Sequence, residues 1–188
     1  MSSQKAGIIL LLLFFCNNAF AQFKYADSVT IPKYGFQNEL SAGEGLGYFI
    51  DPGKSIDFPE IQLKNFTVSK DVFFKKFNRS PQQNYYWVRF AIQNNSDSVL
   101  HPFIFCNGIN YVTLYLVSPN HPVQKILGGG LRNRNKNLSE EEQMYSSLKI
   151  TLAPRQTGMV YIKMVQKTQE FFFTGIEIYK RDAFYNTI

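Results

Sequence analysis

Aromatic and charged side chains alternate with apolar ones in several segments of the sequence. Residues 85–93 (YYWVRFAIQ) are the clearest case, because Trp87 and Arg89 alternate with Val88 and Phe90. Successive side chains of a β-strand point to opposite faces, so this spacing predicts that Trp87 and Arg89 lie together, away from an apolar core. The same alternation assigns further residues to outward faces: Tyr115 in 111–117, Tyr161 and Lys163 in 159–165, and Glu177 in 171–179.

These six residues are of the types that bind sugars. Flat aromatic rings stack on the C–H faces of sugars, and charged side chains supply directional hydrogen bonds. If the strands belong to one sheet, we expect the tryptophan and the two tyrosines to stack on a small-molecule or carbohydrate ligand. Arg89, Lys163 and Glu177 would then hydrogen-bond to it.

The alternative is a structural role for the same residues. Tyrosine, threonine and lysine are frequent on the outer faces of sheets because they favour strands. In this alternative Trp87 packs beneath residues 22–46, and Arg89 pairs with a buried carboxylate. The exposure of the Trp87 indole distinguishes the two interpretations.

Motifs for catalysis or metal binding are nearly absent. Both histidines, His101 and His121, precede a proline in a predicted turn, and their spacing does not match a metal site. The sequence shows no nucleophile elbow, zinc-protease helix or phosphate-binding loop. We therefore expect no enzymatic activity, no cofactor and no metal. A glycosidase stays the enzymatic alternative, because its two carboxylates can be far apart in the sequence.

Composition limits the class of protein. The chain has 188 residues, of which 45% are hydrophobic, 16% aromatic and 18% charged. This is the size of one ordinary domain, and it excludes whole-chain disorder and a protein with many membrane helices. The net charge of +6 is spread along the chain, so we expect no nucleic-acid partner.

The N-terminus resembles a secretory signal peptide. Lys5 precedes the apolar run 6–16 (AGIILLLLFFC), and Ala19-Phe20-Ala21 offers a cleavage site, so residues 1–21 are the predicted signal peptide. We therefore expect an exported, periplasmic protein; an uncleaved anchor is the alternative, although the run is shorter than the ~20 residues that span a bilayer. Cleavage leaves Cys106 as the single cysteine, which predicts a buried thiol and no intramolecular disulfide.

The rest of the chain is rich in strand signals. We divide it into a lead-in segment (22–46), one domain (47–184) and a tail (185–188). Ser69 is expected to cap a short helix over 69–77, in which Val72, Phe73 and Phe77 share a face. Gly128-Gly129-Gly130 is interpreted as a flexible turn that opens a long polar connection. The expected strands are 47–50, 85–93, 102–106, 111–117, 147–152, 159–165 and 171–179. They predict an all-β fold, an antiparallel jelly-roll β-sandwich with one short helix.

Several of these segments also resemble a known family in sequence. Tyr86-Trp87-Val88-Arg89-Phe90 is similar to the Tyr-Trp-Leu-Arg-Phe signature of the second extracellular domain type of bacterial seven-transmembrane receptors with diverse intracellular signalling modules. Other motifs of that family match in order, over roughly 47–184: Tyr48-Phe49-Ile50-Asp51-Pro52-Gly53, Asn94-Asn95-Ser96, Tyr111-Val112-Thr113-Leu114-Tyr115-Leu116 and Val160-Tyr161-Ile162-Lys163-Met164.

The resemblance implies a periplasmic sensor domain with a jelly-roll fold similar to carbohydrate-binding modules. In the family, seven membrane helices and a histidine kinase, cyclase or similar output usually follow. This sequence ends at Ile188 without them. We therefore expect the sensing domain of a membrane receptor, truncated before the membrane helices that are its natural partner. An exported protein-interaction module, which could dimerise, and a stand-alone carbohydrate-binding module are the alternatives.

Overall fold

The computed structural model describes residues 31, 36, 38–42, 46–106, 109–129, 147–167 and 175–180. The predicted signal peptide (1–21), most of the lead-in segment, the polar connection after Gly129 and the tail (185–188) lie outside the described residues. The division of the chain into these segments therefore stays a prediction.

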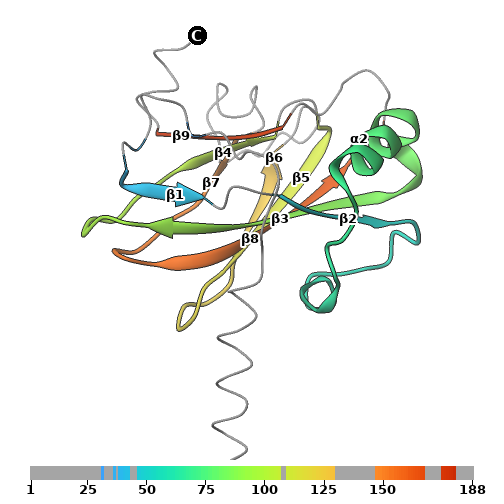
Figure 1. The fold of residues 1–188 in the computed structure, drawn as a ribbon. Coiled ribbons are helices and arrows are strands. Elements are labelled where there is room, and N and C mark those ends of the chain that lie inside the picture. The colour runs from blue at the N-terminus through green and yellow to red at the C-terminus, as the bar shows by residue number, and fades with distance from the viewer. Residues whose placement is uncertain are drawn as a thin grey trace, which may run out of the picture.

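The described residues form two antiparallel sheets, which lie one above the other in Figure 1. The larger sheet has six strands in the order β1–β3–β8–β5–β6, with β2 also paired to β3. Its strands are β1 (Leu40–Ala42), β2 (Gly47–Asp51), β3 (Tyr85–Asn94), β5 (Tyr111–Val117), β6 (Gln124–Gly129) and β8 (Thr157–Val165). The smaller sheet has the order β7–β4–β9, from β4 (Phe103–Cys106), β7 (Ser147–Lys149) and β9 (Ile176–Tyr179). The predicted all-β sandwich is confirmed, whereas its jelly-roll connectivity stays a prediction.

The main core lies between the two sheets, and β3 supplies its largest side chains. Tyr86, Val88, Phe90 and Ile92 are at most 1% exposed, as the two-residue period predicts. Burying each such apolar side chain contributes about 1.5–3 kcal/mol to folding. The opposite wall of this core comes from the smaller sheet: Ile104, Cys106, Leu148, Ile150, Ile176 and Ile178. Cys106 is a free, fully buried thiol, as predicted, and burial raises its pKa to about 12.

One α-helix, α2 (Lys70–Arg79), closes an end of the sandwich (Figure 1). The side chain of Ser69 accepts a hydrogen bond from the Val72 backbone N–H at 3.4 Å, so the predicted cap is confirmed. Phe73 and Phe77 are fully buried against Tyr86, but Val72 is 55% exposed, so the prediction that Val72 shares their face is wrong. The helix turns Val72 away from the single stripe that reaches the core.

Two strands were not expected from the sequence. β1 lies in the predicted lead-in segment and pairs with the end of β3. Gly128 and Gly129 belong to β6, so their interpretation as a turn is wrong. Pairing with β5 outweighs the low strand propensity of glycine there, and the register shifts between Val112 and Thr113 at that point. The remaining short elements are the 3-10 helices η1 (Ile61–Leu63) and η2 (Pro81–Gln83).

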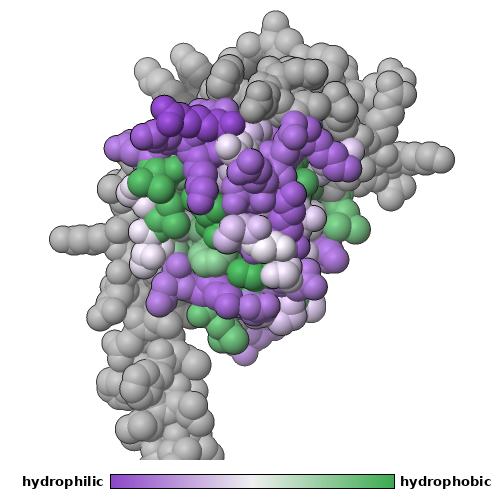
Figure 2. Space-filling model, turned by 90° about the vertical axis from the view of Figure 1, so that its right-hand side faces the viewer, coloured by the Kyte–Doolittle hydropathy of each residue, from purple (hydrophilic) through white to green (hydrophobic). Residues whose placement is uncertain are grey.

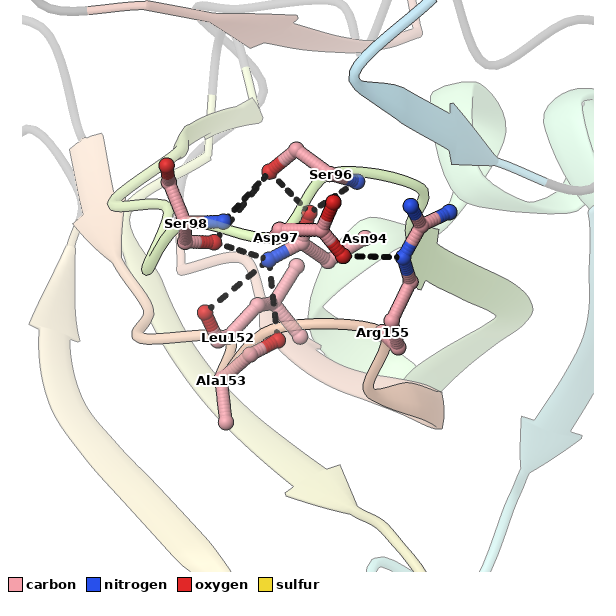
Figure 3. Close-up of polar contacts among 7 residues, drawn as sticks. All are labelled: Asn94, Ser96, Asp97, Ser98, Leu152, Ala153 and Arg155. Atoms are coloured by element: carbon pink, nitrogen blue, oxygen red, sulfur yellow. Dashed lines mark hydrogen bonds and ion pairs between the residues drawn. The ribbon is translucent and has the colours of Figure 1, made fainter.

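A buried asparagine joins two turns at one end of β3 (Figure 3). The Asn94 side-chain amide is fully buried and donates to the carbonyl oxygens of Ser98 (2.7 Å), Ala153 (2.8 Å) and Leu152 (3.3 Å). Its Oδ1 accepts from the backbone N–H of Ser96 at 2.9 Å. A single side chain thus satisfies backbone groups of segments almost sixty residues apart.

Replacing this side chain is expected to weaken the whole sandwich. Asn94→Ala removes several hydrogen bonds of a buried side chain at once, so the free energy of unfolding should fall by about 2–4 kcal/mol in urea denaturation. The control is Asp97→Asn in the same turn, which removes only the exposed contact between Asp97 and Arg155. This variant should unfold at nearly the wild-type urea concentration. An Asn94→Ala protein as stable as the wild type would contradict the role assigned to the amide.

Candidate functional site

Five of the six candidate ligand-binding residues lie together in the structure. Trp87 and Arg89 on β3 are paired with Lys163 and Tyr161 on β8, respectively. Tyr161 is paired in turn with Tyr115 on β5. All five occupy the face of the six-stranded sheet that points away from the three-stranded sheet, called here the outer face. The alternation in the sequence therefore predicted this grouping correctly.

Glu177 does not belong to this group. It lies on β9 of the three-stranded sheet, opposite Phe105 and hydrogen-bonded to the hydroxyl of Tyr179. The expectation that Glu177 shares a face with Trp87 is wrong, because alternation assigns a residue to a face of its own strand and not to a particular sheet. Burial and the neighbouring Glu177 raise the pKa of Tyr179 to about 12.

The outer face is covered, which the sequence analysis did not foresee. Residues 52–68, called here the cover, cross it on the side opposite to the smaller sheet (Figure 1). Ile56, Phe58, Ile61 and Phe66 of the cover pack against the outer-face residues. As a result Trp87 is 0% exposed, and the expectation of an open, ligand-stacking tryptophan is wrong for this conformation. Among the described residues the segment over Trp87 is 52–68, whereas most of residues 22–46, which the structural alternative proposed, lie outside the described residues.

Local interactions explain why the cover lies where it does. Asp51 is buried at the start of the cover, and its carboxylate accepts a hydrogen bond from the Ile56 backbone N–H at 3.0 Å. At the other end, a side chain on Gly47 would place its Cβ 2.9 Å from the Cβ of Phe66, so glycine is needed for this close approach. The Val68 backbone N–H then bonds to the Tyr48 carbonyl at 3.3 Å, which fixes the end of the cover against β2.

Aromatic contacts fill the space beneath the cover. Phe58 stacks on Tyr115 with ring centroids 4.0 Å apart and meets Tyr161 edge-on at 5.9 Å. The Arg89 guanidinium lies 4.2 Å above the centre of the Phe66 ring. Burial raises the pKa of both tyrosines, and Arg89 opposes the rise at Tyr161 by hydrogen bonding and charge. Tyr115, Tyr161 and Arg89 are each less than 10% exposed, so in this conformation they hold the cover.

The indole N–H of Trp87 is a buried donor without a partner. Among the described residues, no acceptor lies within hydrogen-bond distance of its Nε1. An unsatisfied buried donor costs about 1–3 kcal/mol. The closed arrangement over Trp87 is therefore less stable than its apolar packing alone would make it.

One end of the outer face extends beyond the cover and is partly exposed. It is called here the open end, and its residues come from four neighbouring strands and the chain just after β8: Tyr85, Tyr111, Thr113, Leu127, Lys163, Val165 and Lys167. The Lys163 ammonium lies 4.3 Å from the centre of the Tyr85 ring and 5.3 Å from that of Trp87. Lys167 lies in the same way 4.7 Å from the ring of Tyr111.

Lys163 connects the open end to the cover. Its ammonium also donates to the Ile56 carbonyl at 3.5 Å. Of the predicted ligand-binding residues on the outer face, Lys163 is part-exposed, whereas Trp87, Arg89, Tyr115 and Tyr161 are buried. Tyr85 and Tyr111 are not among the predicted ligand-binding residues, although the same alternation places them on this face. Lys167 has no such signal, because it follows the end of β8.

The described residues contain no group of three or more potential metal ligands from histidine, cysteine, aspartate and glutamate. Within the same ranges, no helix is both long and apolar enough to cross a membrane.

Comparison with known proteins agrees with the resemblance seen in the motifs. The family model described as 7TMR-DISM extracellular 2 matches residues 43–173, which is more than half of the chain. The chain belongs to the 7TMR-DISM extracellular 2 family. It is thus an extracellular sensing domain of a membrane receptor, exported from the cytoplasm and associated with the membrane part of that receptor.

Other comparisons add little to this assignment. No curated protein matches the chain significantly. The X-ray crystal structure of protein SO0799 from Shewanella oneidensis has 11% sequence identity and a TM-score of 0.20, and the match covers 57% of this chain and 69% of that one. The family match spans the cover, β3, β5 and β8, so the outer face lies within the 7TMR-DISM extracellular 2 region.

The burial of Trp87 can be tested in this family member directly, because it is the only tryptophan in the chain. We expect the emission spectrum of a buried indole and weak quenching by acrylamide. Phe58→Ala should increase the quenching and lower the free energy of unfolding by about 2 kcal/mol, since it removes a ring that is only part-buried.

Leu63→Ala is the matched control for Phe58→Ala, because Leu63 lies in the cover but is 84% exposed. It should leave both the quenching and the stability unchanged. Strong acrylamide quenching of the wild-type protein would contradict the closed arrangement of the cover.

Proposed function

We propose that this domain is the non-enzymatic, ligand-sensing module of its receptor and that it binds a carbohydrate at the open end. The observation that supports this proposal is the combination, on one part-exposed surface, of two tyrosine rings with two lysine ammonium groups. Tyr85 and Tyr111 offer faces for stacking, and Lys163 and Lys167 offer hydrogen-bond donors beside those rings.

In this proposal the predicted ligand-binding residues divide into two groups. Lys163 contacts the ligand directly. Trp87, Tyr115 and Tyr161 form the aromatic layer beneath the ligand and the cover, together with Arg89. Glu177 has no part in the site, because it belongs to the other sheet.

The position of Lys163 gives binding a route to conformational change. Its ammonium contacts Tyr85, Trp87 and the Ile56 carbonyl at the same time. A ligand that draws Lys163 away from Ile56 removes one of the bonds that hold the cover. Ligands shift an equilibrium only by their difference in affinity for its two states, so the cover is the element whose packing would report binding to the rest of the receptor.

Binding can be measured by calorimetric titration with a panel of neutral and charged oligosaccharides, with Trp87 fluorescence recorded in parallel. We expect saturable binding and a change in Trp87 emission, because Lys163 lies over the indole. Lys163→Ala should weaken binding about 10- to 100-fold, the loss expected for a hydrogen bond to a charged group. Tyr85→Ala should weaken it as well, while the fold is retained.

The structure offers a matched control on the other sheet. Lys149 lies 5.9 Å from the ring of Phe103 on β4, which is again a lysine over an aromatic ring. Lys149→Ala should bind the same saccharides as the wild type. Equal loss of binding in the Lys149 and Lys163 variants, or no binding across the whole panel, would refute a carbohydrate site at the open end.

A protein-interaction role is the second candidate. β6 is the last strand of the six-stranded sheet in the described order, and it exposes Leu127 by 57%. An exposed apolar side chain on this strand can be buried against the surface of another protein. If this is its role, the mass of the protein in size-exclusion chromatography should rise with concentration, and Leu127→Lys should abolish the rise.

A further inference from the structure

We infer that the ligand of the open end is a saccharide that carries anionic groups, such as carboxylates, sulfates or phosphates. This inference rests on the proposed carbohydrate function and specifies the class of ligand. It follows from the number, position and pairing of the lysines on the outer face.

Three lysines on this face each lie over a tyrosine ring. Lys163 lies 4.3 Å from the centre of the Tyr85 ring, Lys167 lies 4.7 Å from that of Tyr111, and Lys125 lies 5.7 Å from that of Tyr115. The register places Lys125 on β6 opposite Tyr115 on β5, which is opposite Tyr161 on β8. The cations therefore occupy one continuous surface on both sides of β5, with β6 and β8 about 10 Å apart.

These positive charges are not neutralised by the described part of the chain. Its ion pairs involve Lys64, Arg155 and Lys180, and none of them involves the three lysines over the rings. The acidic side chain that acts on this region is Asp57 in the cover, whose charge contributes to the raised pKa of Tyr115. Among the described residues, three lysines and one carboxylate give this surface a net positive charge, which attracts anions.

Contact with a ring holds an ammonium group in place but leaves its charge available. A cation–π contact contributes about 0.5–1 kcal/mol at exposed sites and supplies no hydrogen-bond acceptor. Each lysine therefore keeps donors for a ligand while its position is fixed. A small inorganic anion would leave the rings unused, and a neutral sugar would accept hydrogen bonds from the lysines but leave their positive charges without a counter-charge. A saccharide with anionic groups uses both.

The test compares oligosaccharides of equal length in calorimetric titrations of the full chain. The probes are an oligogalacturonate, a sulfated oligosaccharide and a neutral oligosaccharide, each measured at low and high salt. We expect at least one of the two anionic probes to bind ten-fold or more tightly than the neutral one, with affinity that falls as salt rises. The comparison of the two anionic probes separates carboxylate from sulfate recognition.

Variants show whether the lysines are responsible. Lys163→Gln and Lys167→Gln remove a charge but keep a hydrogen-bond donor, so each should weaken anionic binding several-fold more than it weakens neutral binding. Lys149→Gln, on the other sheet, is the control and should change neither. Lys125→Gln should have a smaller effect, because its ammonium lies farther from its ring.

The possible negative results distinguish a wrong ligand class from a wrong proposed function. Neutral and anionic saccharides that bind equally well would refute the anionic class and leave the proposed function intact. Inorganic sulfate that competes as well as the sulfated oligosaccharide would show that the rings are not used and would refute a saccharide ligand. Failure of every saccharide to bind refutes the proposed function itself.

Discussion

The packing of the cover against Trp87 determines what the outer face of the large sheet can do. β3 has apolar side chains on both faces, and both are buried: one face by the smaller sheet and the other by Ile56, Ile61 and their neighbours. The sheet is therefore the middle layer of the molecule along most of β3 and β8. At the open end the rings of Tyr85 and Tyr111 in that middle layer are partly accessible to solvent.

The surface on the side of α2 is mostly hydrophilic. Figure 2, which views the molecule from that side, shows hydrophilic areas with separate hydrophobic areas between them. Exposed charges on α2 include Lys70, Lys75 and Arg79. Ile56, Phe58, Ile61 and Phe66 of the cover instead pack inward, onto the outer face, whereas Leu63 is exposed. The cover thus lies between the polar surface and the aromatic layer of Trp87, Tyr115 and Tyr161. The open end lies just beyond the edge of the cover.

The cover combines strong and weak contacts. Phe58, which stacks on Tyr115, and the fully buried Ile61 hold the cover on the sheet by burying apolar surface. This burial is the larger contribution to the stability of the closed arrangement. Against this stand the unsatisfied indole N–H of Trp87 and the long hydrogen bond from Lys163 to Ile56. The weak contacts lie toward the open end, where a ligand would first touch the protein.

Strand periodicity predicted much of this arrangement and failed where contacts depend on distant segments. The alternation around Trp87 gave both faces of β3 correctly, because a period of two is a local property of the backbone. It could not assign Glu177 to a sheet, since that depends on long-range pairing. The cover was missed because Ile56, Phe58, Ile61 and Phe66 follow no regular period, and four large apolar residues in a loop were the available signal. Gly128 and Gly129 in β6 show that pairing with a neighbour can outweigh propensity.

The most direct test of the central claim is a map of NMR chemical-shift changes on addition of an anionic oligosaccharide. The account predicts that the largest changes fall on Tyr85, Tyr111, Lys163 and Lys167, with smaller ones at Trp87 and in the cover. Changes centred on Glu177 and the three-stranded sheet, with the open end unaffected, would contradict it.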